Sequence, residues 1–272
     1  MVSARRVTIL GCGSSGGVPR PDGDWGACDP SELRNRRTRC SLLIEQWRET
    51  HDVGDPTTVL IDTSPDIREQ LLAARVRRID AILYSHDHAD QTHGIDDVRA
   101  LAYRMRRRIP AYMDAFTRRS LETRFRYVFH GEGGYPPILD LGPELAPLQP
   151  LKISGPGGDI AIEPLDQDHG HIRSLGFRFG DVAYNNDVVG LPPETFERLA
   201  GVRTWIVDAL RRAVHPSHAH LDQTLEWIAA LKPARAVLTN MHVDLDYNTL
   251  RGELPGGVEP AHDGWRLDYT HP

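Results

Sequence analysis

The segment His86-Asp87-His88-Ala89-Asp90 concentrates side chains that bind metal ions. Its two imidazoles are two residues apart and follow the apolar run 81–84, which is typical of a β-strand. In extended backbone, side chains at positions i and i+2 lie on the same side, so both rings can reach one ion. Two imidazoles with carboxylates suit Zn, Mn or Fe. The alternative interpretation is a solvated polar loop, which a His-x-His pattern alone also fits.

Residues of the same kind recur where other apolar runs end. These residues are His169, Asp187, Asp208 and His242, after runs that end at residues 165, 184, 207 and 238. Loops at strand ends carry many functional sites because the sheet behind them is rigid. A random scatter of polar residues would not repeat this arrangement, so the pattern favours metal binding over a polar loop.

The composition is typical of a globular protein, with 272 residues, 40% of them hydrophobic and 26% charged. The net charge of −6 argues against a global basic surface for duplex nucleic acid. No apolar run approaches the roughly 20 residues of a membrane-spanning helix, and the first apolar stretch is too short for a signal peptide. We therefore expect a cytoplasmic protein without a membrane partner. A homodimer is the default expectation, because dimers are the commonest oligomers.

Short apolar runs and helical patterns are spread over the whole chain. Strands are expected at residues 7–10, 41–45, 58–61, 81–84, 159–165, 177–179, 182–184, 204–207 and 236–238. Helices are expected at residues 65–74, 95–107, 193–199, 221–231 and 247–253. The Pro- and Gly-rich stretch 131–158 is typical of a loop excursion. This pattern predicts one mixed α/β domain over residues 1–272, built from sheets with helices outside.

The motif His86-x-His88-x-Asp90, with Asp62 ending an earlier strand, resembles the signature of the metallo-β-lactamase superfamily. His169, Asp187 and His242 follow in the order of its later motifs. Within that superfamily the chain resembles the phosphoribosyl cyclic phosphate phosphodiesterases, through segments 10–19, 35–39, 94–99, 169–170 and 238–242. The resemblance implies a four-layer αββα sandwich, in which two mixed sheets pack face to face with helices outside.

The resemblance also implies a set of metal ligands. His86, His88 and His169 would hold one ion, and Asp187 would bridge it to a second ion. Asp90 would bind that second ion and would also orient the nucleophile.

This chain departs from the family pattern at the second ion. Gln91 and Asn240 stand where relatives place imidazoles, and His242, two residues further on, is expected to act as a ligand instead. An amide oxygen is a poorer ligand than imidazole for a borderline metal. We therefore expect Zn or Mn as the cofactor, with one ion bound tightly and a second bound weakly or absent.

The remaining expected site residues surround these ligands. His218 matches the substrate-facing His of the family, which would protonate the leaving alkoxide. Asp62 and Gln91 would lie beside the ligands, and Asp62 would hold a ligand imidazole in its tautomer. Expected substrate contacts are Arg36, Arg37 and His215. Guanidinium groups match phosphate oxygens, although an ordinary solvated charge run is the alternative interpretation of the two arginines.

Two other sequence features, a glycine pattern and the three cysteines, do not indicate a further binding site. The segment 11–16, Gly-Cys-Gly-Ser-Ser-Gly, matches the dinucleotide-binding pattern G-x-G-x-x-G. That function needs a helix immediately afterwards, whereas Gly17, Pro19 and Pro21 follow here, so we expect a glycine loop near the metal site. The additional structural zinc of the relatives needs several cysteines close together after the first loop. Only Cys28 is available there, so we expect no such zinc, and we expect the three cysteines to be packed thiols.

Together these features predict a metal-dependent phosphodiesterase that hydrolyses a small cyclic or nucleotide-like phosphate ester. The ion would lower the pKa of bound water and provide hydroxide as the nucleophile. One alternative keeps the fold and changes the ester, to a thioester, a lactone or an RNA 3′ end. Another is a degraded hydrolase that binds a nucleotide or a small molecule without turnover. Fold alone does not decide among them.

Overall fold

The protein's computed structural model describes residues 3–271. The chain forms two compact units, each assembled from separate segments. Unit 1 takes the described residues of Met1–Leu10, Ser41–Ala161 and Arg266–Pro272, and unit 2 takes Gly11–Cys40 and Ile162–Trp265. The expectation of a single domain over residues 1–272 stays a prediction.

Unit 1 is built on a seven-stranded mixed sheet with the order β14-β1-β2-β3-β4-β5-β6. Strand β2 pairs antiparallel with β3, and β3 to β6 run parallel to one another. The bounds are β1 Ser3–Gly11, β2 Ser41–Trp47, β3 Thr57–Ile61, β4 Ala81–Leu83, β5 Ile109–Tyr112, β6 Leu139–Leu141 and β14 Trp265–His271. Because β3 and β4 are parallel, the segments that follow them leave the sheet at the same edge.

The helices of unit 1 lie between these strands in the chain. They are α1 Ile67–Ala73, α2 Ala89–Thr92, the 3₁₀ turn η2 Ile95–Val98, α3 Arg99–Met105, α4 Ala115–Arg124 and α5 Arg126–His130. Apolar residues of α1, η2 and α3 pack on the sheet in one cluster that includes Leu60, Ile67, Ile82, Val98 and Ala102. Burying this apolar surface holds the loop after β4 against a rigid support.

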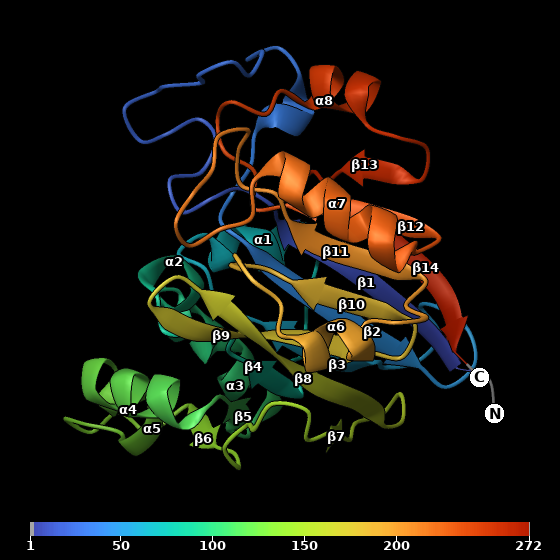
Figure 1. The fold of residues 1–272 in the computed structure, drawn as a ribbon. Helices are drawn as coiled ribbons and strands as arrows, with labels where there is room; N and C mark the ends of the chain where they lie inside the picture. Colours follow the sequence, from blue (N-terminus) through green and yellow to red (C-terminus); the bar gives the residue numbers. More distant parts are fainter. Residues whose placement is uncertain (1–2, 272) are drawn as a thin grey trace. The chain divides into compact units, whose positions relative to one another are not determined.

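Unit 2 contains most of a second seven-stranded sheet, with the order β13-β12-β11-β10-β9-β8-β7. The bounds are β7 Leu151–Ile153, β8 Ile160–His169, β9 Ile172–Phe179, β10 Val182–Asn185, β11 Thr204–Asp208, β12 Arg235–Thr239 and β13 Val258–Pro260. Figure 1 shows β9, β10 and β11 side by side. Strands β10 to β13 are parallel, and β9 is antiparallel to both β8 and β10. The carboxyl ends of β8, β10, β11 and β12 therefore meet at one edge.

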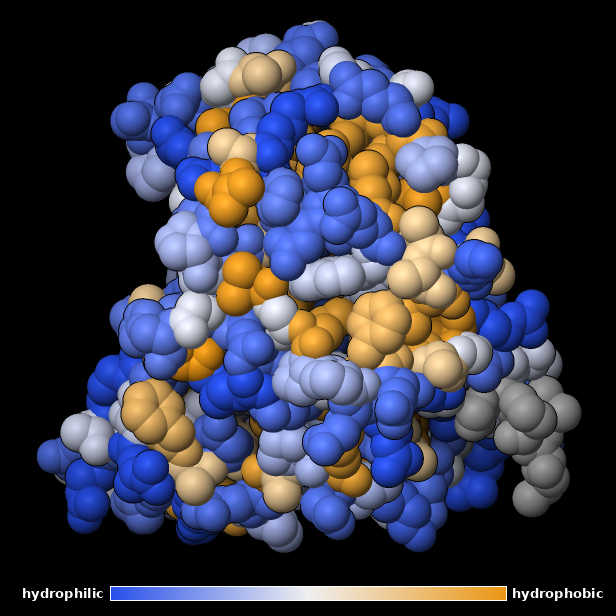
Figure 2. All heavy atoms as spheres, in the orientation of Figure 1, coloured by the Kyte–Doolittle hydropathy of each residue, from blue (hydrophilic) through white to orange (hydrophobic). Residues whose placement is uncertain are grey.

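The helical segments of unit 2 are η1 Leu33–Asn35, α6 Pro193–Arg198, α7 Leu221–Leu231 and α8 Tyr247–Glu253. Figure 2 shows a mostly hydrophilic face, with apolar residues gathered beside α7. Leu221 and Ile228 of α7 are buried, as expected for an amphipathic helix on a sheet. Among residues 3–271, no helix has the length and apolar character that crossing a membrane requires.

The sequence locates most elements correctly. All nine expected strands overlap observed ones, and the helices expected at 221–231 and 247–253 have those bounds. The helix expected at 95–107 is two segments, η2 and α3, and α3 ends at Met105 because Arg106 adopts a left-handed conformation. The loop expected at 131–158 contains β6 and β7, each only three residues long, which is too short for a periodicity signal.

A buried carboxylate in unit 2 makes the stability of the protein depend on pH. Asp263 accepts hydrogen bonds from the backbone and side chain of both Cys12 and Thr38, at 2.6 to 3.5 Å. Burial nevertheless raises the pKa of Asp263 to about 6. Because the folded state holds this proton more tightly than the unfolded state, the stabilisation is present at low pH and disappears as the pH rises through about 6.

We expect Asp263→Asn to remove this dependence. Between pH 4 and pH 7, wild-type protein should lose up to about 3 kcal/mol relative to the variant, since one pKa unit corresponds to about 1.4 kcal/mol. Urea unfolding at several pH values measures the difference. Parallel pH curves for the two proteins would contradict this role of Asp263.

Candidate metal centre

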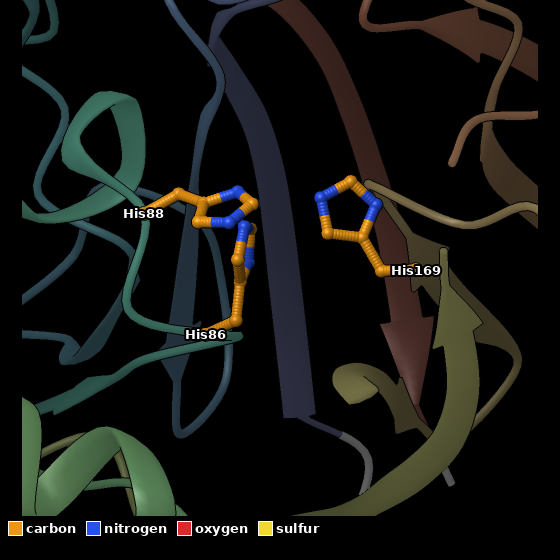
Figure 3. Close-up of side chains that lie close together, drawn as sticks. All are labelled: His86, His88 and His169. Atoms are coloured by element: carbon orange, nitrogen blue, oxygen red, sulfur yellow. The ribbon is translucent and has the colours of Figure 1, made fainter. Parts of the chain in front are cut away.

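Two imidazoles of unit 1 lie in the segment that directly follows β4. His86 and His88 follow the strand, and their ring centroids are 4.5 Å apart in an edge-to-face arrangement (Figure 3). His86 is buried and His88 is half-buried. Figure 3 also shows His169, which ends β8 in unit 2.

The tautomer of His86 is set through a serine. Ser85 donates its backbone N–H and its hydroxyl to the two oxygens of Asp62, at 2.8 Å each. The Ser85 hydroxyl oxygen lies 3.0 Å from Nδ1 of His86 and accepts its hydrogen, which places the lone pair of His86 on Nε2. Burial raises the pKa of Asp62 to about 8. Asp62 therefore contacts His86 indirectly, through the hydroxyl of Ser85. An indirect contact of this kind orients a metal-binding imidazole.

Two further expected residues follow on α2. Asp90 is half-buried, and its Oδ2 accepts a hydrogen bond of 3.3 Å from Nε2 of Gln91. Gln91 is fully buried, and its backbone carbonyl accepts the N–H of Thr63. The amide thus contacts the predicted ligand Asp90 directly, in the place where relatives have an imidazole.

In unit 2, three predicted site residues lie together. His169, Asp187 and His218 each offer one donor atom within 4.8 Å of the others. Nδ1 of His169 donates to the carbonyl oxygen of Ser217 at 2.8 Å, so the lone pair of His169 is on Nε2. That atom lies 4.0 Å from Oδ1 of Asp187. Imidazole nitrogens and carboxylate oxygens suit a divalent metal ion, and His169 and Asp187 therefore fit one.

Asp208 completes this group and was not among the predicted site residues. Its Oδ2 lies 2.9 Å from Nδ1 of His218, and the side chain is fully buried at the end of β11. The same oxygen accepts the N–H of Val188 at 3.1 Å. A carboxylate held in this way orients an imidazole and stabilises its protonated form. The sequence contains an indication of this role, because Asp208 directly follows the apolar run 204–207, as the other site residues follow theirs.

The strand ends around the two donor sets have unusual backbone. Asp62, Asp187 and Asn240 adopt left-handed conformations, with φ of 62°, 53° and 59°. Such conformations are uncommon outside glycine, and Asp and Asn tolerate them best. All three side chains are also buried. Backbone strain of this kind clusters at functional sites.

His242 lies outside the groups of residues that could bind a metal ion. In the described part of the chain, the groups of three donor residues leave it out. Its Nδ1 lies 3.0 Å from Oδ1 of Asp244, and its Nε2 contacts the guanidinium of Arg20. Because that guanidinium can only donate, Nε2 must accept and its lone pair is engaged. The geometry therefore does not support the expectation that His242 binds metal.

Arg37 also differs from its expected role. Its side chain is 1% exposed and donates to the backbone carbonyls of Leu245, at 2.7 Å, and His242, at 3.4 Å. It also donates to Oδ1 of Asn35, at 3.2 Å. This guanidinium ties the first loop of unit 2 to the segment after β12 and cannot also hold a substrate phosphate. Arg36 is exposed and remains a candidate for that contact.

We expect Arg37→Ala to reduce the free energy of unfolding by about 1–3 kcal/mol, because the substitution removes the guanidinium that donates to the buried carbonyl of Leu245 and to two further acceptors. Arg36→Ala should change it by less than about 0.5 kcal/mol, as an exposed substitution does. Urea unfolding of both variants provides the measurement. Equal stability of the two variants would contradict the structural role of Arg37.

His215 lies beside His218, with ring centroids 5.0 Å apart. Its Nδ1 is 3.2 Å from the hydroxyl oxygen of Ser217. Burial, assisted by the neighbouring His218 and Arg211, lowers the pKa of His215. His215 is therefore a neutral side chain near neutral pH, which suits a hydrogen-bond contact with substrate better than a charge contact.

Comparison with known proteins identifies the class. A family model described as a beta-lactamase superfamily domain matches residues 57–241. The solved structure of a diphosphatase from the PhnP family is 33% identical, with a TM-score of 0.87 over 99% of both chains. Zinc-bound PqqB from Methylobacterium extorquens is 18% identical, with a TM-score of 0.72 over 97% of this chain and 100% of its own, and shows the shared fold.

The chain therefore belongs to the metallo-β-lactamase superfamily, and within it to the branch that includes the PhnP family. Membership of this superfamily implies binding of a divalent metal ion, and the clustered His and Asp side chains fit one. The two seven-stranded mixed sheets and these matches confirm the expected fold class.

One curated relative has a different name. An octanoyltransferase from Porphyromonas gingivalis is 33% identical over 264 residues, which make up 95% of this chain and 50% of that protein. The chain thus spans about half the length of the curated relative that it matches.

Proposed function

We propose that the protein is a metal-dependent phosphodiesterase acting on small cyclic or nucleotide-like phosphate esters. The observation that carries the proposal is His218, paired with buried Asp208 and lying beside the donors His169 and Asp187. A proton donor next to a metal-binding group matches the two needs of diester hydrolysis, a nucleophile at neutral pH and a proton for the leaving oxygen. The diphosphatase relative adds support, because its reaction also displaces a group from phosphorus.

The family pattern assigns the metal ligands of the proposed enzyme. His86, His88 and His169 would hold one ion, Zn or Mn, and Asp187 and Asp90 would be available to a second, weaker one. When bound, a divalent ion lowers the pKa of water and polarises phosphoryl oxygens.

Protein groups would perform the remaining steps. Asp90 would accept a hydrogen bond from the attacking water and orient it towards phosphorus. As the bond from phosphorus to the leaving oxygen breaks, His218 would deliver its proton to that oxygen. Asp208 would stabilise the imidazolium before transfer and keep Nδ1 protonated throughout. Arg36 would pair with a non-bridging oxygen of the substrate.

A direct test uses metal-stripped protein with Zn or Mn added back and bis-p-nitrophenyl phosphate as substrate. Metal-dependent release of p-nitrophenol is expected. The same samples are assayed with an octanoyl thioester, because the octanoyltransferase relative makes acyl esters the second candidate substrate class. Thioester hydrolysis without diester hydrolysis would overturn the proposal in favour of that class. Metal binding without either activity would favour a binding protein.

The weaker second ion can be tested by restoring the missing imidazoles. We expect the double variant Gln91→His, Asn240→His to raise the bound zinc from about one to about two ions per chain, since imidazole is the better ligand. Elemental analysis after dialysis measures the stoichiometry. An unchanged zinc content in the folded double variant would show that these two positions do not limit the second ion.

A further inference from the structure

A surface groove of about 710 Å³ runs between α1 and α3 in unit 1. Its apolar lining comes from Leu71, Leu72, Val76, Leu101 and Tyr103. Leu72 is 60% exposed and Tyr103 is 50% exposed. Large apolar side chains that remain this exposed beside one another are a common sign of a surface that binds a partner.

The groove carries positive charge that the protein itself does not neutralise. Of its four arginines, Arg68 pairs with Glu69 and Arg99 pairs with Asp96. Arg75 and Arg77 are exposed and form no ion pair within residues 3–271.

Exposed arginines beside the groove add to its positive charge. Arg104 and Arg106, at the end of α3, are also exposed and without an ion pair in the described chain. Two carboxylates line the groove, Asp96, which pairs with Arg99, and Asp97. Burial and the neighbouring Asp96 raise the pKa of Asp97. A basic groove on a chain of net charge −6 is a local feature, not a consequence of composition.

We propose that this groove binds an acidic amphipathic helix of a partner protein. The apolar floor matches the apolar stripe of such a helix, and Arg75 and Arg77 match carboxylates beside that stripe. A small amphiphile fits less well, because ligand pockets usually bury most of the ligand and this groove leaves its own side chains half exposed. A single-stranded RNA fits less well because Tyr103 is the only aromatic residue in the lining, and RNA sites use stacking platforms.

A peptide selection tests which kind of helix binds the groove. A phage library of helical 16-residue peptides with randomised surface positions is selected on the full chain, with counter-selection on Arg75→Glu, Arg77→Glu. We expect enriched sequences with apolar residues at spacings of three and four and Asp or Glu beside them. Their synthetic forms should bind wild-type protein at least about tenfold more tightly than the double variant. Binding should weaken with added salt.

Matched variants separate this site from general basic attraction. Leu72→Asp should weaken binding as the charge reversals do, whereas Arg119→Glu, an exposed arginine of α4 outside the groove, should leave it unchanged. Circular dichroism checks that each variant is folded. Failure of the library to enrich acidic amphipathic peptides would overturn the proposal, as would binding that Leu72→Asp and the charge reversals leave intact. Tight binding of oligouridylate that the same variants abolish would replace it with an RNA site.

Discussion

Replacing His88 by alanine is expected to remove the tightly bound metal ion and to reduce phosphodiester turnover to background. The substitution deletes one of three proposed imidazole ligands, and a metal centre that loses an imidazole loses affinity and chemistry together. His88 is half-buried and its ring lies against His86, so the change should leave the fold intact. Elemental analysis and the bis-p-nitrophenyl phosphate assay measure the two losses.

A neighbouring histidine provides the control for this variant. His93 is exposed at the end of α2, and its ring contacts Phe125 with centroids 5.6 Å apart. His93→Ala should keep both metal and turnover. Metal content that survives His88→Ala unchanged would exclude His88 as a ligand and would place the ion elsewhere.

His218→Ala should have the second largest effect, and it should separate chemistry from metal binding. If His218 protonates the leaving oxygen, its loss should reduce kcat by about 10²- to 10⁴-fold on a substrate with an alkoxide leaving group, such as a ribose cyclic phosphate. On bis-p-nitrophenyl phosphate the loss should be much smaller, because p-nitrophenolate leaves without a proton. The content of tightly bound metal should not change.

Two further variants make the assignment specific. Asp208→Asn should reproduce part of the kcat loss and should alter the pH profile, because the amide cannot stabilise a protonated His218. His220→Ala, at the residue that precedes α7, should leave kcat unchanged. Equal losses on both substrates would mean that His218 does not act as the proton donor. Loss of the tightly bound ion from His218→Ala would instead make it a ligand of that ion.

Much of the fold could be predicted from local patterns. Buried strands such as β3, Thr57–Ile61, are runs of β-branched and aliphatic residues, and α7 has the apolar spacing of an amphipathic helix. The short strands β6 and β7 could not be predicted, since three residues carry no periodicity and their pairing depends on the neighbouring strand.

The presence of a metal site could also be predicted from the sequence. His86 and His88 are two residues apart after an apolar run, and His169 and Asp187 follow other runs, so the spacing predicts a metal site. The hydrolase class followed from the resemblance of these motifs to the metallo-β-lactamase superfamily. Residue type and order suffice for the metal site because ligand chemistry is a property of side chains and because strands deliver their last residues to a sheet edge.

Only the tertiary structure decided which polar residues do what. Arg36 and Arg37 are neighbours of the same type, yet the fold buries Arg37 among backbone carbonyls and leaves Arg36 exposed. His242 is engaged by Arg20 and Asp244, and Asp208 is paired with His218. These outcomes depend on contacts between residues far apart in the chain. Burial and hydrogen-bond partners, which local sequence does not encode, determine whether a charged side chain is structural or free to act.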